Sequence, residues 1–152
     1  MWLDRNGQWF HDGQPIRHVR LSALLSASIA RDGALQLIVT TGKDTLPFTA
    51  EDAPLHAKTV IRNGERLSFQ LSNRTELPLE NVQRILVDAE GHMRTRSHDE
   101  RFWIRLLKPA AQAIMSAAVE RKGRLWVPSA TGSVLLVEHL ADTDWCAPPT
   151  SH

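Results

Sequence analysis

The sequence predicts an α+β protein with two repeated motifs, each a helix packed on a small, curved and mostly antiparallel sheet. Three observations support this fold class. Residues 21–42 and 111–132 align without a gap at a constant offset of 90. An amphipathic helical stretch opens each segment, and short strands separated by turn residues fill the rest of the chain. The eight identical positions are Ala23/Ala113, Ser26/Ser116, Ala27/Ala117, Arg31/Arg121, Gly33/Gly123, Leu35/Leu125, Thr41/Thr131 and Gly42/Gly132.

The first half begins with short strand material at residues 2–10, broken by Asn-Gly and Asp-Gly turn signals. A helix is expected near residues 19–31, and Gly33 is expected to end it in the left-handed conformation. A strand over 35–40 should then pair with 45–49. The apolar face of the helix comprises Leu21, Leu24, Leu25, Ser28 and Ile29.

The middle of the chain has the pattern of β-hairpins. Asn63-Gly64 is a strong hairpin signal, and Glu90-Gly91 marks a second turn. The expected strands are residues 58–62, 66–71, 82–88, 92–96 and 101–106.

The second helix repeats the design of the first. Pro109 suits its first turn, where no amide hydrogen is required, and Gly123 is expected to end it. Strands over 125–128 and 133–138 follow. The apolar face comprises Ala111, Ile114, Met115, Ala118 and Val119. We therefore expect two repeat-bearing subdomains, 1–75 and 76–140, and a loosely ordered Pro-rich tail, 141–152.

Composition narrows the range of functions. The 152 residues can bury one sizeable core or two halves that share one. The net charge of +1 gives no large field, so we expect neither nucleic acid nor membrane as a partner. The lone Cys146 can form no internal disulfide, and no apolar run resembles a signal peptide or a membrane span. A cytoplasmic protein is the resulting prediction.

Several motifs are similar to those of a bacterial family of domains of unknown function, family twelve-eighty-five. They are Asn6-Gly7-Gln8-Trp9-Phe10, Gly13-Gln14-Pro15-Ile16-Arg17, the helix Leu21–Ser28, the segment Leu37–Thr40 and Ala50-Glu51-Asp52-Ala53-Pro54. The chain departs from the family pattern at Thr41–Asp44, at Leu55 and at Leu106–Pro109, so it resembles a member that diverges in its second half. The resemblance implies repeated motifs, a homodimer and a part in signalling, with no demonstrated activity.

The acidic pair Glu51-Asp52 is the most informative polar cluster. In an extended segment the two carboxylates point to opposite faces, so they cannot act as an acid–base pair without a bulge. Asp52 before Ala-Pro is also an ordinary turn former. The alternative is that Asp52 accepts hydrogen bonds from a ligand, with His56 nearby.

Other chemistry-bearing patterns are absent from the sequence. The seven histidines lack metal-ligand spacing and no cysteine cluster occurs, so we expect no metal and no cofactor. No nucleophile motif is present, so the catalytic residues are unknown. Trp9, Trp103 and Trp126 are expected to pack in the core, although Trp9 and Trp126 could instead line a groove or a dimer seam.

Our leading hypothesis is a non-catalytic ligand- or protein-binding module with a regulatory role, acting through a cleft between repeats or a homodimer surface. Its candidate ligand-binding residues are Arg17, Glu51, Asp52, His56 and Trp126. The alternative is an enzyme for a small anionic or carbonyl substrate, with Asp52 and His56 as the acid–base pair and Arg17 as anion clamp. A third hypothesis is nucleic-acid binding through Arg94, Arg96, Arg101 and Arg105.

Overall fold

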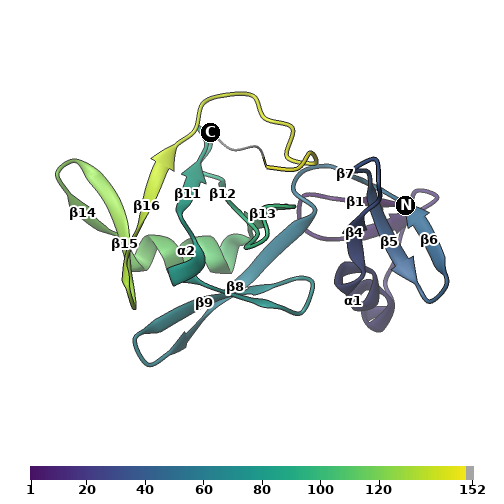
Figure 1. Ribbon diagram of the computed structural model, residues 1–152, viewed down its shortest axis with the longest axis horizontal. Coiled ribbons are helices and arrows are strands. Elements are labelled where there is room, and N and C mark those ends of the chain that lie inside the picture. The colour runs from purple at the N-terminus through teal and green to yellow at the C-terminus, as the bar shows by residue number, and fades with distance from the viewer. Residues whose placement is uncertain (150–152) are drawn as a thin grey trace.

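The chain folds into two lobes that lie side by side, as the computed structural model shows for residues 1–149 (Figure 1). The N-terminal lobe contains helix α1 (Val19–Ala27) and two small sheets. The four-stranded sheet has the order β3-β2-β1-β7, with β1 (Trp2–Leu3), β2 (Trp9–His11), β3 (Gln14–Pro15) and β7 (Thr49–Ala50). The three-stranded sheet is an antiparallel meander of β4 (Ile29–Arg31), β5 (Leu37–Thr41) and β6 (Asp44–Pro47).

The second lobe is a nine-stranded open sheet with helix α2 (Lys108–Ala117) against strand β8. Its order is β10-β9-β8-β13-β12-β11-β16-β15-β14, and the β8–β13 and β11–β16 pairs are parallel. Its elements are β8 (Leu55–Asn63), β9 (Arg66–Leu71), β10 (Glu76–Pro78), the 3-10 turn η1 (Leu79–Asn81), β11 (Arg84–Val87), β12 (Met93–Arg96), β13 (Trp103–Leu106), β14 (Val119–Arg121), β15 (Arg124–Ser129) and β16 (Gly132–Glu138).

The sheets separate between β7 and β8. The expected subdomain boundary at residues 75/76 instead falls within the β9–β10 hairpin, where Glu76 pairs with Gln70. Strands β8 and β9, expected in the first subdomain, thus belong to the large sheet of the second lobe. None of the helices within residues 1–149 has the length and apolar character needed to cross a membrane.

Helix α1 is shorter than the sequence predicted. His18 caps it by accepting a hydrogen bond from Leu21 N at 3.1 Å, and the helix ends at Ala27. Residues 29–31, predicted as helix, form β4 because they pair with β5, where Ile29 faces Val39. Branched Ile29 suits a strand as well as a helix, so tertiary pairing decides its conformation.

Both glycines expected to end the helices lie in hairpin loops instead. The loop after β4 is organised by Asp32, whose carboxylate accepts from Ala34 N and Gln36 N, both at 2.9 Å. Leu35, not Gly33, takes the positive φ there, at 65°. Gly123 does have a positive φ, 78°, but in the two-residue turn between β14 and β15.

The predicted hairpins are confirmed. β8 pairs with β9, β11 with β12 and β5 with β6, all antiparallel, and the strands expected at 125–128 and 133–138 form a further hairpin, β15–β16, that was not predicted. In the first of these, Asn63 faces Arg66, so the turn residues are Gly64 and Glu65, one position later than expected. Gly64 supplies the positive φ of 65° that such a turn requires.

The α+β class is confirmed, whereas the two helices pack differently. Each is followed by a three-stranded antiparallel meander. Helix α1 contacts β5, the middle strand of its own meander, whereas α2 contacts the corresponding strand β15 but lies mainly against β8. The first hairpin loop spans residues 32–36 after α1 and only 122–123 after α2, so the ungapped alignment loses register beyond it. Ser26 is buried and Ser116 is exposed, although they align.

The apolar faces of both helices are narrower than the sequence patterns suggested. Leu25 is buried on α1, but Leu21 and Leu24 are 42% and 48% exposed. On α2, Ile114 is fully buried, whereas Met115 is 50% exposed. A nine- or ten-residue helix on the edge of a sheet structure buries about one residue per turn, which leaves part of each predicted face in solvent.

Candidate functional site

A buried ion cluster that contains Asp52 of the acidic motif joins the two lobes. Asp52 follows β7, and its two carboxylate oxygens accept hydrogen bonds from Arg94 of β12 and Arg105 of β13. Arg94 donates from Nε and Nη2 at 3.2 and 3.1 Å, and Arg105 donates from Nη1 at 2.7 Å. All three side chains are at most 10% exposed. Burial raises the pKa of the Asp52 carboxyl, but the hydrogen bonds from both arginines outweigh it, so its pKa lies below the usual value.

The C-terminal segment completes this cluster. The Trp145 ring lies 4.3 Å from the Arg94 guanidinium and packs edge-on against Trp103. Cys146 donates from Sγ to the carbonyls of Ala50 and Asp52, at 2.9 and 3.2 Å. Residues 139–149 contain neither helix nor strand, yet these contacts fix them against both lobes. The final residues of the expected loosely ordered tail, 150–152, lie outside the described part of the chain.

A cavity of about 430 Å³ opens between the N-terminal lobe and the large sheet. Its walls come from the turn before β2, from α1, from β8 and from the residues just after β9 and just before α2. Among the residues that line it are Gly7, Arg17, Ala23, Ser26, His56, Lys58, Ser72 and Leu107. The cavity therefore has walls from both lobes.

His56 gives this cavity its chemical character. The side chain is 1% exposed, and Nε2 is the one buried side-chain nitrogen or oxygen within residues 1–149 that has no hydrogen-bond partner. Burial is the main cause that lowers the pKa of His56, to about 4, and the negative charges of Asp52 and Asp4 offset it only in part. The imidazole is thus neutral near pH 7. An unpaired buried polar atom is costly, so Nε2 is the side-chain atom of this region that most lacks a hydrogen-bond partner.

The turn beside His56 requires a glycine. Gly7 has φ of 85°, and a Cβ at this position would lie 3.4 Å from His56 Nδ1. The turn is organised by Asp4, which accepts hydrogen bonds from Asn6 N at 2.9 Å and Gln8 N at 2.8 Å. A close approach of backbone to ring therefore holds the imidazole in place at the cavity wall.

Two of the five candidate residues meet at this cavity. Arg17 is exposed at its rim and His56 is buried in its wall, although 39 positions separate the two residues in the sequence. The chain between them forms α1 and the three-stranded meander, so the sequence alone gave no distance between the two side chains.

The other three candidates lie elsewhere. Glu51 is exposed and accepts hydrogen bonds from Arg5, from N at 2.8 Å and from Nε at 3.2 Å. Asp52 belongs to the ion cluster and neither forms the predicted turn bonds to backbone amides nor contacts the cavity. Trp126 lies in β15, where the Arg121 guanidinium sits 5.5 Å from its ring. No residue of the cavity wall lies on β15.

The structure argues against the enzyme hypothesis and against the nucleic-acid hypothesis in the form in which each was stated. Both oxygens of Asp52 are occupied by arginines, and no hydrogen bond links Asp52 to His56 in the described chain, so the two side chains are not arranged as an acid–base pair. Arg94 and Arg105 are buried, which leaves only Arg96 and Arg101 of the four-arginine set near the surface. A phosphate backbone could not reach the buried pair.

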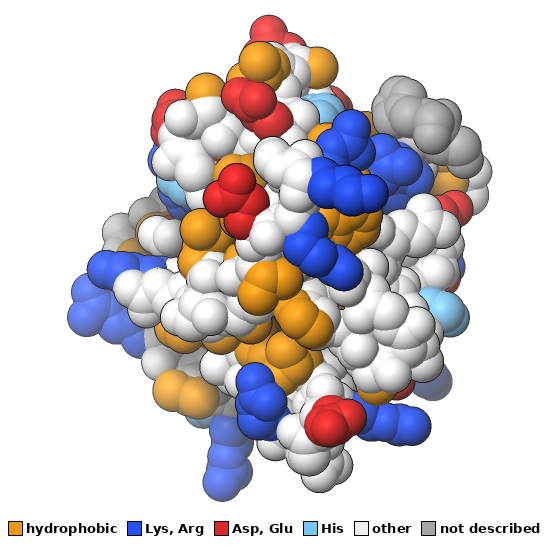
Figure 2. All heavy atoms as spheres, turned by 90° about the vertical axis from the view of Figure 1, so that its left-hand side faces the viewer, with side chains coloured by type: hydrophobic (Ala, Val, Ile, Leu, Met, Phe, Trp, Pro, Cys, Tyr) orange, Lys and Arg blue, Asp and Glu red, His pale blue; other side chains and the backbone are white. Residues whose placement is uncertain are grey.

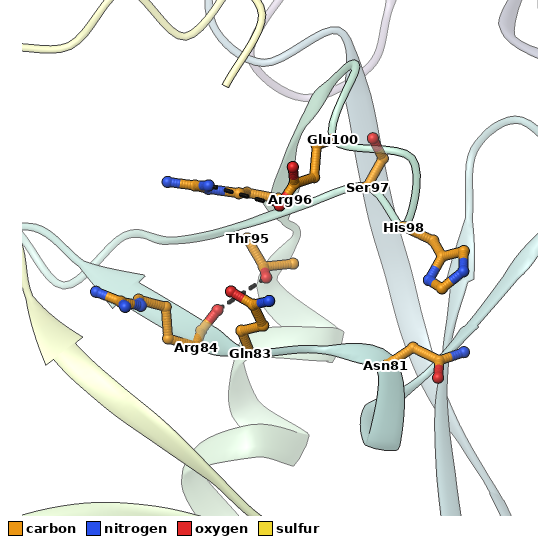
Figure 3. Close-up of a pocket in the computed structure, with 8 residues that line it drawn as sticks. All are labelled: Asn81, Gln83, Arg84, Thr95, Arg96, Ser97, His98 and Glu100. Atoms are coloured by element: carbon orange, nitrogen blue, oxygen red, sulfur yellow. Dashed lines mark hydrogen bonds and ion pairs between the residues drawn. The ribbon is translucent and has the colours of Figure 1, made fainter. Parts of the chain in front are cut away.

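Other hollows of the described chain lack a buried side-chain polar atom without a partner. One of about 190 Å³ is lined by Asn81, Gln83, Arg84, Thr95, Arg96, Ser97, His98 and Glu100 (Figure 3). There the Thr95 hydroxyl donates to the Arg84 carbonyl at 2.9 Å, and Arg96 lies 3.8 Å from Glu100. Figure 3 shows Arg84 and Arg96 extending to the same side, away from Asn81 and His98. A third hollow, of about 530 Å³, lies beneath the C-terminal segment and is largely apolar.

Sequence reasoning missed several cavity residues. Lys58 was assigned only to a strand, and Ser72 and Leu107 carried no motif. Ser72 accepts a hydrogen bond from His56 N at 3.0 Å, and Ser26 accepts one from Trp9 Nε1 at 2.9 Å. Only the pairing of β8 with β9 and β13 brings these residues together, and no local pattern encodes it.

Two solved structures share this two-lobed α+β fold. One is a DUF1285 family protein from Silicibacter pomeroyi DSS-3, with a TM-score of 0.68 and 21% identity, covering 90% of this chain and 79% of that chain. The other is a DUF1285 family protein from Shewanella baltica OS155, with a TM-score of 0.52 and 16% identity, covering 70% of this chain and 83% of that chain. No family model matches the chain, and no curated protein does.

These similarities confirm, at the level of the fold, the resemblance that the sequence motifs indicated. The chain is similar in fold to proteins of the DUF1285 family, a family of domains of unknown function. The fold alone therefore supplies no reaction, and function has to be argued from the site.

Proposed function

We propose that the protein is a non-catalytic binding module with a regulatory role, and that its ligand occupies the cavity between the lobes. The observation that carries the proposal is the unpartnered Nε2 of buried His56 in the wall of that cavity. A cavity of about 430 Å³ is of the size that small-molecule sites have in proteins. Arg17, the second candidate residue at this cavity, would contact the ligand from the rim.

Binding rather than catalysis fits the state of the titratable groups. General acid–base catalysis needs a group whose pKa lies near the working pH and which can reach the substrate. His56 has a pKa of about 4, and the carboxylate of Asp52 is held ionised and fully paired by two arginines. Neither group is poised to exchange a proton near neutrality.

The regulatory part of the proposal rests on where the walls come from. Ser26 and Ala23 belong to α1 of the N-terminal lobe, and His56 and Lys58 belong to β8 of the large sheet. A ligand that touches both walls favours one relative placement of the lobes over others. Its binding can thus be transmitted to a surface that a protein partner recognises.

A homodimer would use the face around β15, β16 and α2. Three apolar side chains are exposed on this face: Met115 of α2 (50%), Val119 of β14 (44%) and Leu125 of β15 (37%). Figure 2 shows an apolar strip on this side of the molecule, with Lys and Arg side chains around it. Because such strips are uncommon on monomers, we propose that a second copy covers it. A Leu125→Glu variant that is monomeric in sedimentation, against a dimeric wild type, supports this, and a monomeric wild type contradicts it.

Two further features belong to the proposal. The shared order of helix and three-stranded meander after α1 and α2 suggests an ancestral duplication whose copies have diverged. The free thiol of Cys146 fits a cytoplasmic location, where thiols stay reduced.

The ligand site can be tested by thermal-shift screening against metabolites and nucleotides, because a bound ligand stabilises the folded state. The cavity-filling variant Ala23→Met is paired with Ala113→Met, at the aligned position of α2 outside the cavity. We expect a compound that stabilises the wild type and Ala113→Met but not Ala23→Met. Equal stabilisation of both variants places the site elsewhere, no stabilisation by any compound contradicts small-molecule binding, and turnover of the compound favours the enzyme.

A further inference from the structure

We infer that the cavity between the lobes binds a compact oxyanion, a carboxylate or a phosphate group. This inference rests on the proposed ligand-binding function and specifies the chemical class of the ligand. It follows from three separate features of the cavity: the charge of its rim, the helix end at its edge and the free hydrogen-bond donors in its wall.

The rim carries positive charge without any acidic side chain. Arg17 and Lys58 are exposed and line the opening, and none of the lining residues within the described chain is Asp or Glu. The nearest acidic groups that act on His56 are Asp52 and Asp4, and neither lines the cavity. Asp52 is moreover neutralised by its two arginines. An anion at the opening thus meets two cations and no like charge.

The N-terminus of α2 adds to this field. Leu107, the residue at its N-cap, lines the cavity, and no side chain accepts a hydrogen bond from the first turn. The helix has ten residues, and Lys108 opens it. Leu107 N already donates to Ala57 O and Pro109 has no amide hydrogen, so the contribution of this helix start is the partial positive charge of its aligned peptide dipoles.

The wall offers neutral donors where an oxyanion needs them. The Ser26 and Ser72 hydroxyls each accept a hydrogen bond, from Trp9 Nε1 and from His56 N, and neither donates one within residues 1–149. Their O–H hydrogens therefore remain free for a ligand oxygen. His56 Nε2 has no partner, and the backbone hydrogen bond to Arg5 favours the neutral tautomer with its proton on Nδ1, so Nε2 can accept from a protonated oxygen of a phosphate.

An oxyanion is complementary to these groups. Its oxygens accept from the two serine hydroxyls, and its charge faces Arg17, Lys58 and the positive end of the α2 dipole. A cationic ligand would meet two like charges, and a purely apolar ligand would leave His56 Nε2 unpaired. The inference therefore distinguishes ligand classes.

The test uses the full chain with inorganic phosphate and with acetate as probes, titrated at constant ionic strength against chloride. Affinity is measured by calorimetry, and the site is located by amide chemical shifts of Gly7, Ser72 and Leu107. We expect Arg17→Gln and Lys58→Gln each to weaken binding about tenfold, as loss of one charged hydrogen bond implies. The control is Arg20→Gln, an exposed arginine of α1 outside the cavity, which should bind as the wild type does.

The outcomes separate this inference from the function on which it rests. Phosphate binding that both cavity variants weaken supports a phosphate-bearing ligand, and the same pattern with acetate supports a carboxylate. Binding that responds equally to Arg20→Gln overturns the inference, since it reports general charge. If neither probe binds while a neutral or cationic compound stabilises the wild type but not Ala23→Met, the oxyanion class is wrong and the binding function stands.

Discussion

Replacing Asp52 by Asn should destabilise the fold strongly, because it leaves two buried guanidinium groups without their shared counter-charge. Three charge-assisted hydrogen bonds end on the carboxylate, at 2.7, 3.1 and 3.2 Å, and every partner is at most 10% exposed. Removal of one partner of a buried pair costs roughly 3–5 kcal/mol. Arg94 keeps an ion pair with Asp88 at 3.0 Å, whereas Arg105 keeps none among the described residues, so the upper half of this range is expected.

Urea unfolding followed by tryptophan fluorescence measures this loss, since Trp145 and Trp103 lie beside the cluster. For a chain of this size the melting temperature should fall by roughly 2–4 °C for each kcal/mol. The neighbouring acid provides a matched control. Glu51→Gln removes an equal charge from an exposed pair with Arg5, which solvent screens, so its midpoint should barely move. Equal effects of the two substitutions would refute the account of the buried cluster.

Three further predictions concern the cavity and the first helix. The pKa of His56 is lowered from 6.5 to about 4, so as the pH falls the unfolded chain takes up this proton before the folded protein does. The free energy of unfolding should therefore decrease by about 2–3 kcal/mol between pH 6.5 and pH 4. Urea midpoints of the wild type and of His56→Gln across this range isolate the effect, and the same dependence of both midpoints on pH would exclude it. Gly7→Ala and Gly13→Ala should each cost about 1–3 kcal/mol, because both glycines have positive φ and the added Cβ meets only an ordinary contact at the His56 ring in the first case and open space in the second. A much larger loss for Gly7→Ala in urea unfolding would contradict this. Ser26→Ala should cost about 1–3 kcal/mol by leaving buried Trp9 Nε1 unpaired, whereas Ser116→Ala, at the exposed aligned position, should change the free energy of unfolding by less than about 0.5 kcal/mol.

Local features of the chain were predictable from the sequence. The turns at Gly64 and Gly91 require positive φ, which glycine adopts readily, so the β8–β9 and β11–β12 hairpins could be predicted. Pro109 correctly indicated the first turn of α2. The end of α1 could not be predicted in the same way, since the residues after Ser28 form a strand only because β5 lies beside them.

Contacts between distant segments were beyond the reach of local patterns. The partners of Asp52 stand 42 and 53 positions later in the chain. Arg94 and Arg105 face each other across β12 and β13, an arrangement that the sequence does not encode by spacing. The same limit applies to the cavity, where only the adjacency of α1 and β8 brings Arg17 toward His56. The sequence therefore indicated two residues of the cavity, whereas the pairing of Asp52 with Arg94 and Arg105 could not be predicted from it.

The return of the chain's end to its beginning has a consequence for biosynthesis. Arg31 donates to the carbonyl of Cys146, 115 positions later, and the Cys146 thiol donates to the carbonyl of Ala50. A nascent polypeptide can build the meander around β5 early, yet these two bonds must wait until Cys146 has been translated and has left the ribosome. Messages that stop before Trp145 would yield an open product, with Arg94 deprived of its aromatic cover and the two lobes less firmly joined, and such products would be preferred substrates for cellular proteases.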